Sequence, residues 1–166
     1  MSEVSPFDSR AFRDVLGRFP TGVAVVAATH EGASGGVSIG SFFSISLEPP
    51  LVGFCIGSSS ASWALIRTAG SFVVNILSDG QQELSNRFAS KDADKFAGLE
   101  WQPAESGRGP RIAGCLGYLD CDIDQVVPAG DHDIVVGRVA ALELGVSGGD
   151  PLVFFGGRYH TASALG

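Results

Sequence analysis

The stretch from residue 36 to residue 56 constrains the fold more than any other part of the sequence. It reads GVSIGSFFSISLEPPLVGFCI, in which two runs of strand-forming residues flank the pair Pro49 and Pro50. Proline fixes its own backbone and disfavours helix at the residue before it, so we expect a strand, a tight turn and a second strand. Gly and Ser occupy positions in the first run where a buried strand normally carries Val, Ile or Leu. This composition indicates that something other than side chains fills the space above that face, as in the floor of a cofactor site.

Short strands separated by turn residues account for most of the remaining chain. Besides the central stretch, strands are expected at residues 23–29, 71–77, 117–127, 134–144, 152–155 and 158–160. Strand 23–29 should form a hairpin with the central stretch. Helices are expected at residues 8–19 and 63–67, and after Asp79, which forms a capping-box-like start with Gln82. Residues 91–110 read as a covering excursion, and the whole pattern predicts an antiparallel barrel.

Two segments carry a one-sided apolar pattern. Asp8 or Ser9 can cap the first helix, whose apolar edge we expect to pack on the barrel; it consists of Phe12, Val15, Leu16 and Phe19. In residues 117–124, apolar residues alternate with Tyr118 and three aspartates, Asp120, Asp122 and Asp124. This alternation predicts a strand with one face on the core and the aspartate face in water.

Length and charge narrow the class of protein. A chain of 166 residues is expected to form a single domain, residues 1–166. A net charge of −7 with 11 Lys and Arg gives no electrostatic footprint for nucleic acid. A hydrophobic content of 45% suggests apolar surface buried in a homodimer. With neither a secretory signal nor an 18-residue apolar run in this sequence, we expect a cytoplasmic protein without a membrane span, and Cys55, Cys115 and Cys121 as buried reduced thiols.

Several common kinds of site are missing from the sequence. Neither the spacing of metal ligands nor the Gly-x-Ser-x-Gly pattern of a nucleophilic serine is found. The three spaced glycines of a dinucleotide-binding domain are also absent. We therefore expect no metal and no separate Rossmann domain.

The central stretch resembles one known family, through Ser38-Ile39-Gly40-Ser41-Phe42 and through residues 44–52. The resemblance continues, in the same order, in Phe19-Pro20-Thr21-Gly22-Val23, Phe72-Val73-Val74-Asn75, Arg87-Phe88-Ala89, Gly130-Asp131-His132 and Gly137-Arg138-Val139. It is to the flavin reductases, the small NAD(P)H-dependent reductase components of two-component flavin monooxygenases. The resemblance implies a mostly β, FMN-binding split β-barrel with short peripheral helices. It also implies hydride transfer from NADH or NADPH to FAD or FMN, with reduced flavin supplied to a separate monooxygenase.

Two segments are candidates for holding the flavin. The resemblance places Ser38, Ile39, Gly40, Ser41 and Phe42 along the isoalloxazine; on spacing alone, they equally suit a Gly/Ser-rich edge strand. Ser58, Ser59, Ser60 and Ser62, followed by Trp63, read as a phosphate cradle at a helix start or as a flexible polar turn. The family commonly has a basic residue beside these serines and Pro after the Trp. Ser58 and Ala64 stand there instead, which weakens the charge of the site.

The remaining candidates follow from the resemblance, each beside a plainer structural interpretation. Asn75 lies near the flavin or satisfies a neighbouring backbone group. Arg87, next to Phe88, either binds the phosphate or adenylate or is an exposed charge on a helix. Lys91 and Lys95 are weaker candidates for the same phosphate-binding role. His132 orients the hydride donor or is a surface turn residue. The nicotinamide end is assigned to Phe155, Gly156, Gly157, Arg158, Tyr159 and His160.

Two other functions stay open at this point. One is a flavin-binding or haem-binding protein on the same barrel, without reductase turnover. The other is a flavin-dependent oxidase of the pyridoxamine-phosphate oxidase type, although the scarcity of Lys and Arg disfavours a phosphate-bearing substrate. The same scarcity favours NADH over NADPH, whose 2′-phosphate asks for a cationic pocket.

Overall fold

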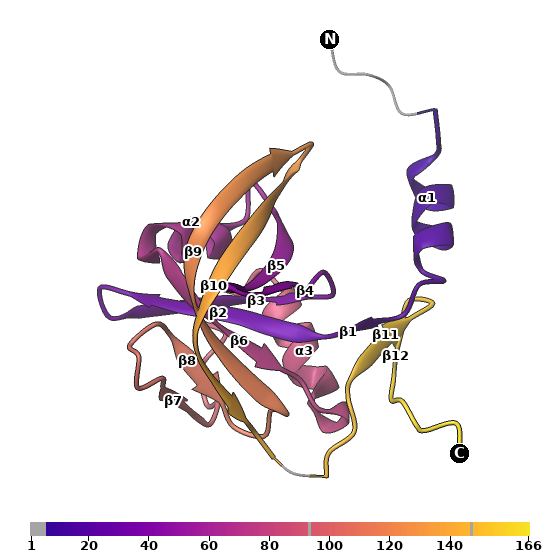
Figure 1. Ribbon diagram of the computed structural model, residues 1–166. Helices are drawn as coiled ribbons and strands as arrows, with labels where there is room; N and C mark the ends of the chain where they lie inside the picture. Colours follow the sequence, from indigo (N-terminus) through magenta and orange to yellow (C-terminus); the bar gives the residue numbers. More distant parts are fainter. Residues whose placement is uncertain (1–5, 93, 147) are drawn as a thin grey trace.

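The computed structural model describes residues 6–92, 94–146 and 148–166, and it is mostly β (Figure 1). Its helical elements are α1 (Ser9–Leu16), α2 (Ala61–Ala69), the 3-10 turn η1 (Asp79–Gln81) and α3 (Gln82–Ala89). Its strands are β1 (Thr21–Gly22), β2 (Ala24–His30), β3 (Ala33–Ile39), β4 (Phe43–Leu47), β5 (Pro50–Gly57), β6 (Ser71–Ile76), β7 (Trp101–Pro103), β8 (Pro110–Ile112), β9 (Gly117–Ala129), β10 (His132–Leu144), β11 (Val153–Phe155) and β12 (Arg158–His160).

Seven antiparallel strands form the main sheet, in the order β3-β2-β6-β9-β10-β5-β4. The two edge strands, β3 and β4, are neighbours in the sequence, so residues 40–42 carry the chain from one edge to the other. The sheet curls so that β3 comes into contact with β5 near the opposite edge. The expected split β-barrel is therefore confirmed, as is the hairpin of β2 with β3.

The central stretch differs from the expectation in one respect. Its first half is not one strand, because it breaks at Gly40 between β3 and β4. A Cβ added at Gly40 would lie only 2.8 Å from the hydroxyl of Thr21 in β1, so a larger residue at this crossing would displace the Thr21 side chain. The second half is as expected, since β4 and β5 form a hairpin across Pro49 and pair Leu47 with Pro50.

Two apolar clusters hold the sheet. One lies between the curled strands and α2, where Phe54 and Phe72 meet edge to face at a centroid distance of 5.2 Å. The other lies under α3 and includes Phe88. Helix α2 begins two residues earlier than expected and ends two residues later, since Ser60 caps its start and Gly70, at φ +71°, ends it. The capping box before α3 is one residue earlier than expected, with the side chain of Gln81 accepting from the N–H of Ser78 at 3.0 Å.

The expectation that the aspartate face of β9 meets water is wrong at Asp120. This residue is fully buried, because the β7–β8 hairpin of the 91–112 segment covers it. Arg111 donates to Asp120 through Nε at 3.3 Å and Nη2 at 3.0 Å, and the hydroxyl of Ser106 donates at 2.6 Å. The covering excursion is thus confirmed, and it provides the partners that a buried carboxylate needs.

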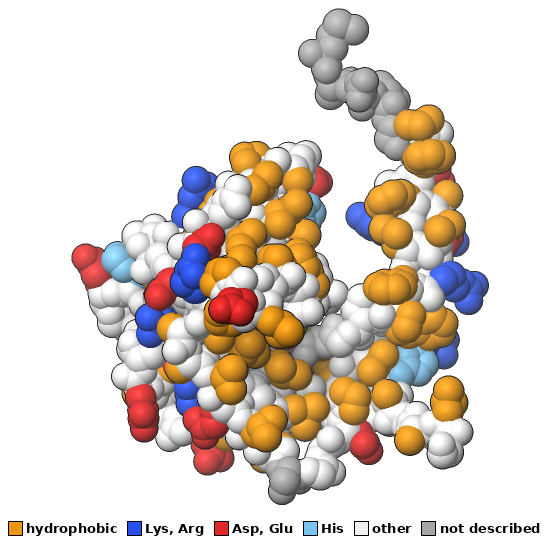
Figure 2. All heavy atoms as spheres, in the orientation of Figure 1, with side chains coloured by type: hydrophobic (Ala, Val, Ile, Leu, Met, Phe, Trp, Pro, Cys, Tyr) orange, Lys and Arg blue, Asp and Glu red, His pale blue; other side chains and the backbone are white. Residues whose placement is uncertain are grey.

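The expectation that α1 packs on the barrel is not met within the chain. Asp8 caps the helix as expected, accepting from the N–H of Arg10 at 2.9 Å. Its apolar edge is exposed, however, with Val15 at 72% and Phe19 at 75%, and no described residue of α1 is buried (Figure 2). One hydrogen bond fixes the end of the helix, from the N–H of Gly156 to the carbonyl of Gly17 at 2.9 Å. Helix α1 therefore stands clear of the sheet, with β11 and β12 beside its end (Figure 1).

Two of the three cysteines are fully buried, as expected, and burial raises the pKa of the Cys115 and Cys121 thiols to about 12. Cys55 is partly exposed. In the part of the chain that the structure describes, no helix has the length and apolar character needed to span a membrane.

The Asp120 contacts lead to a stability prediction. Replacing Arg111 by Ala leaves a buried carboxylate without its cation, which typically costs about 3–5 kcal/mol. We expect R111A to lower the free energy of unfolding by about that amount in urea titrations. The control is R138A, because Arg138 pairs with Asp124 on the surface, where an ion pair contributes about 0–1 kcal/mol. Equal effects of the two substitutions would contradict this account of Asp120.

Candidate functional site

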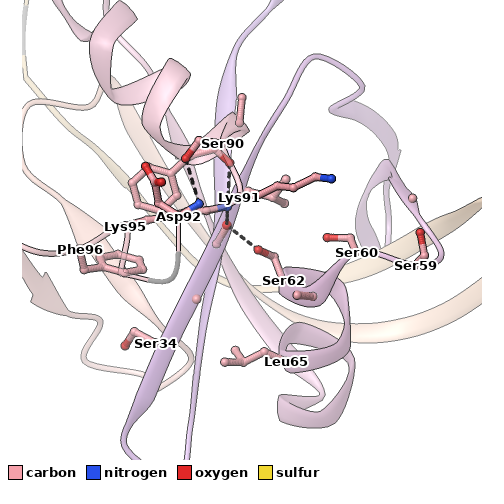
Figure 3. A pocket seen from close by; sticks show the side chains of 17 residues that line it. Ser34, Ser59, Ser60, Ser62, Leu65, Ser90, Lys91, Asp92, Lys95 and Phe96 are labelled. Carbon is pink, nitrogen blue, oxygen red and sulfur yellow. Dashed lines mark hydrogen bonds between the residues drawn. The ribbon is translucent and has the colours of Figure 1, made fainter.

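A cavity of about 670 Å³ opens between α2, β3 and the segment that follows α3 (Figure 3). Glycines form part of its wall on β3, and serines surround its mouth at the start of α2. It is lined by Ser34, Gly35, Gly36, Val37, Gly57, Ser59, Ser60, Ala61, Ser62, Leu65, Phe88, Ala89, Ser90, Lys91, Asp92, Lys95 and Phe96. Its size lies within the range of about 300–1,000 Å³ that is typical of ligand pockets.

Three of the four predicted serines lie in this cavity. Ser59, Ser60 and Ser62 line it, and the first amides of α2 lie beside them (Figure 3). The hydroxyl of Ser62 donates to the carbonyl of Gly36 at 2.8 Å, which ties α2 to β3. Ser58 instead uses its N–H on the carbonyl of Asp131 at 3.1 Å. The serine run is thus an ordered turn into a helix, and its N–H and O–H groups can donate to an anion.

Two lysines lie across the cavity from the serines. The Nζ of Lys95 donates to the carbonyls of Gly36 and Phe88, both at 3.1 Å. Burial lowers the pKa of Lys95, and the nearby carboxylate of Asp92 opposes that shift. Lys91 has no hydrogen bond or ion pair with the residues that the structure describes, and Figure 3 shows its side chain extending toward the Ser59 and Ser60 side. Both lysines can therefore contribute positive charge to the cavity.

Arg87, the cation favoured from the sequence, lies elsewhere. It lines a second cavity of about 420 Å³ with Leu84 and Leu99, and its Nη1 donates to the carbonyl of Ala97 at 3.0 Å. The next residue, Phe88, does line the first cavity and is fully buried. A Cβ at Gly36 would meet its ring at 3.0 Å, so this glycine lets α3 pack close to β3. Arg87, Lys91 and Lys95 are four residues apart, a spacing that would place them on one face of a continuous helix. Helix α3 ends at Ala89, however, so the two lysines lie on a different segment from Arg87.

Ser38, assigned to the isoalloxazine, and Tyr159, assigned to the nicotinamide end of the site, belong to one hydrogen-bond network. The hydroxyl of Ser38 lies 2.8 Å from that of Ser85, and the Tyr159 hydroxyl donates to Ser85 at 2.8 Å and to Asn86 at 3.0 Å. Sequence reasoning missed Ser85, a buried serine on α3. Its only sequence signal is a small polar residue on the apolar face of a helix.

The other residues predicted to line the isoalloxazine serve the sheet junction in this chain. Ile39 is buried and Phe42 packs against the same apolar cluster. The hydroxyl of Ser41 donates to the carbonyl of Cys55 and accepts from its N–H, both at 2.9 Å. Asn75 is fully buried and satisfies backbone groups: its amide donates to Val25 and Pro110, and its oxygen accepts from Ile112. The interpretation of Asn75 as a backbone partner therefore accounts for its position.

His132 and the last cluster lie outside this cavity. His132 is exposed at the start of β10, opposite Gly57 of β5, with Nδ1 2.7 Å from Oδ1 of Asp131. That hydrogen bond lowers the pKa of the exposed Asp131 carboxyl. Phe155 and Arg158 belong to the β11–β12 hairpin, whose turn consists of Gly156 and Gly157 at φ +58° and +75°. Trp63 is buried, and its indole donates to Asp133 at 2.6 Å.

The donor set of the cavity suits an anionic ligand. Hydroxyls, helix amides and ammonium groups are the donors that bind phosphate in proteins. Across the described residues, no three His, Cys, Asp or Glu side chains come together as a metal site.

Comparison with known proteins gives a consistent family. Residues 16–163 match the family described as flavin reductase like domain. The chain is 46% identical over 162 residues to a flavin reductase from Pseudomonas putida, covering 97% of this chain and 94% of the relative. It is 45% identical over 153 residues to HsaB, the reductase subunit of a flavin-dependent monooxygenase from Mycobacterium tuberculosis, covering 92% of this chain and 81% of the relative.

Solved structures agree. Nitrilotriacetate monooxygenase component B from Mycobacterium thermoresistibile superposes with a TM-score of 0.89 at 43% identity, over 94% of this chain and 87% of that one. An NADH:FAD oxidoreductase from Streptomyces globisporus, solved with NAD and FAD fragments, superposes with a TM-score of 0.90 at 32% identity, over 99% of both chains.

The contacts of Ser41 lead to the second prediction. Replacing Ser41 by Ala leaves the N–H and carbonyl of Cys55 without this partner, at a typical cost of about 1–3 kcal/mol. We expect S41A to lower the midpoint of urea unfolding accordingly. S44A, at an exposed position of β4, is the control and should leave the midpoint unchanged. If S41A is as stable as S44A, the hydroxyl does not hold the sheet junction.

Proposed function

The chain belongs to the flavin reductase family, and from that premise we propose that it transfers hydride from NADH to FAD or FMN and supplies reduced flavin to a separate monooxygenase. The observation that supports this most strongly is the match over nearly the whole chain to named flavin reductases, in both sequence and structure. NADH is favoured over NADPH because the chain has few cations to bind the 2′-phosphate of NADPH.

In the proposed complex, the phosphate end of the flavin lies in the cavity between α2 and β3. The hydroxyls of Ser59 and Ser60, with the first amides of α2, donate to the phosphate, while Lys91 and Lys95 add charge from the other side. The hydroxyl of Ser62 stays on the carbonyl of Gly36. Lys95 already donates to two carbonyls, so Lys91 is the freer of the two cations among the described residues. A site with few fixed cations suits a flavin that has to be released after reduction.

Bound flavin accepts the hydride and the nicotinamide donates it, so the protein has to align two rings and exclude water. We assign alignment of the nicotinamide to His132 and to the β11–β12 hairpin with Phe155, Arg158 and Tyr159. The His132 ring is held by Asp131 through Nδ1, and the hydrogen bond leaves Nε2 available to the nicotinamide. The Ser38–Ser85–Tyr159 network ties β12 through α3 to β3, and it therefore fixes the hairpin relative to the strand assigned to the isoalloxazine.

We further infer that the chain assembles as a homodimer. A helix as short as α1 is marginal in water without tertiary contacts, yet its apolar edge is uncovered by any described residue. A second apolar surface lies on the outer face of the sheet, where Phe43 and Ile45 pack over Gly53 at 42% and 44% exposure. Figure 2 shows hydrophobic side chains both on α1 and on the body of the molecule across an open space from it. In a two-fold dimer, α1 of each copy would pack on the sheet of the other copy, and both apolar surfaces would be buried in both copies.

Activity is the third prediction. We expect purified protein to oxidise NADH only when FAD or FMN is added, with saturation in flavin. K91A should raise the KM for FMN about tenfold, as expected for the loss of about 1.4 kcal/mol from one charged contact, and K91R should restore it. The KM for riboflavin, which lacks phosphate, should not change.

Two outcomes would contradict the proposed function. A bound flavin with no oxidation of NADH or NADPH would indicate a carrier or an oxidase. Turnover with an unchanged KM for FMN in K91A would place the phosphate away from this cavity.

Assembly is the fourth prediction. Light scattering should give the mass of two chains for the wild-type protein. Replacing both Phe12 and Val15 by Glu should give one chain with an unchanged circular dichroism spectrum, because these side chains are exposed within the chain. Asp14→Asn, on the same helix, is the control and should remain a dimer. A dimer that survives the double substitution would exclude α1 from the contact.

A further inference from the structure

A buried indole–carboxylate pair joins α2 to β10. Trp63 is 2% exposed and Asp133 is 6% exposed, and Nε1 of the indole donates to Oδ2 of the carboxylate at 2.6 Å. A buried Trp N–H needs an acceptor, and a charged acceptor gives a stronger hydrogen bond than a neutral one. The pair connects residues 70 positions apart in the sequence.

The carboxylate is costly at this position. Asp133 lies on the same face of β10 as Val135 and Gly137, which face the core. The nearest cation is the exposed Arg67, with Nη1 4.0 Å away. Removing a carboxylate from water costs several kcal/mol, and a surface arginine at that distance offsets little of it. An apolar residue would fill the position without this cost. The presence of Asp133 therefore calls for an explanation in terms of what it holds.

The pair is one of two links that join the serine run to β10 and the turn before it. At its start, the N–H of Ser58 donates to the carbonyl of Asp131 at 3.1 Å. At its end, Trp63 is held by Asp133. The serines that line the cavity, Ser59, Ser60 and Ser62, lie between these two links in the sequence. Their position relative to β10 is therefore set by residues 131 and 133, on either side of His132.

We propose that Asp133 is a positioning residue, which acts through Trp63 to hold the first turn of α2 where its serines and amides receive the phosphate of the flavin. This inference rests on the proposed function, because it assigns the phosphate to this cavity. Asp133 itself touches no ligand. It fixes the rotation of α2 about its axis, and a small rotation of that helix moves the hydroxyl of Ser60 and the first amides of α2 out of line with an anion.

The test compares FMN with riboflavin, which has the same ring and lacks the phosphate. Trp63→Phe removes the N–H and keeps an aromatic ring in the core. We expect it to raise the dissociation constant for FMN about tenfold or more and to change that for riboflavin less than about twofold. Asp133→Asn keeps a neutral acceptor for the indole, so FMN binding should fall between those of Trp63→Phe and the wild type. Trp101→Phe, on the covering hairpin, is the matched control and should bind both flavins as the wild type does.

The outcomes separate this inference from the proposed function. Equal weakening of FMN and riboflavin in Trp63→Phe would mean that the pair is merely structural, and unchanged binding of both would mean that it positions nothing; either result overturns the inference while the reductase assignment stands. Wild-type protein that binds FMN no better than riboflavin would overturn the phosphate site and the inference together. If Trp63→Phe does not fold, Asp133→Asn alone decides, through the same ratio of FMN to riboflavin affinity.

Discussion

The fold depends on how the two edges of one curled sheet are joined. Strands β3 and β4 lie at opposite ends of the strand order, yet only residues 40–42 separate them. Gly40 allows the chain to pass against Thr21, and the hydroxyl of Ser41 takes the place of a strand partner for Cys55. Because unpaired buried backbone groups are costly, this one side chain stabilises the point where regular strand pairing stops. The Gly and Ser content of the central stretch is thus explained in part by the junction itself.

The cavity is a consequence of the same arrangement. With β3 at an edge, its outer side is free to meet α2 and α3, which pack on it through Ser62 and Phe88. Glycine at positions 35 and 36 keeps the strand surface flat between the two helices, so an open space remains above it. The serines of α2 and the lysines after α3 then face each other across that space (Figure 3). The site is therefore made by three segments that are separate in the sequence, each placed by its contact with β3.

Buried polar groups serve as connections between layers of this fold. Asn75 ties β6 to β2 and β8, Asp120 ties β9 to the covering hairpin, and Asp133 ties β10 to α2. Each is satisfied by named partners, as burial requires. Such contacts are specific in a way that apolar packing is not, because they fix the rotation and register of the segments that they join. Apolar side chains remain exposed on α1 and on the outer face of the sheet, and we assign their contacts to a second copy of the chain.

The sequence by itself determined the class of fold, the hairpin of β2 and β3 and the turn at Pro49. It narrowed the cap of the first helix to Asp8 or Ser9, and the serine run to a helix start or a polar turn. These follow from local chemistry, because turn residues, caps and alternation act over a few positions. Only the tertiary structure decided that Asp120 is buried, that Arg87 lines a different cavity from Lys91 and Lys95, and that Ser85 joins Ser38 to Tyr159. Burial and proximity depend on which distant segment covers a residue, and alternation in one strand carries no information about that segment.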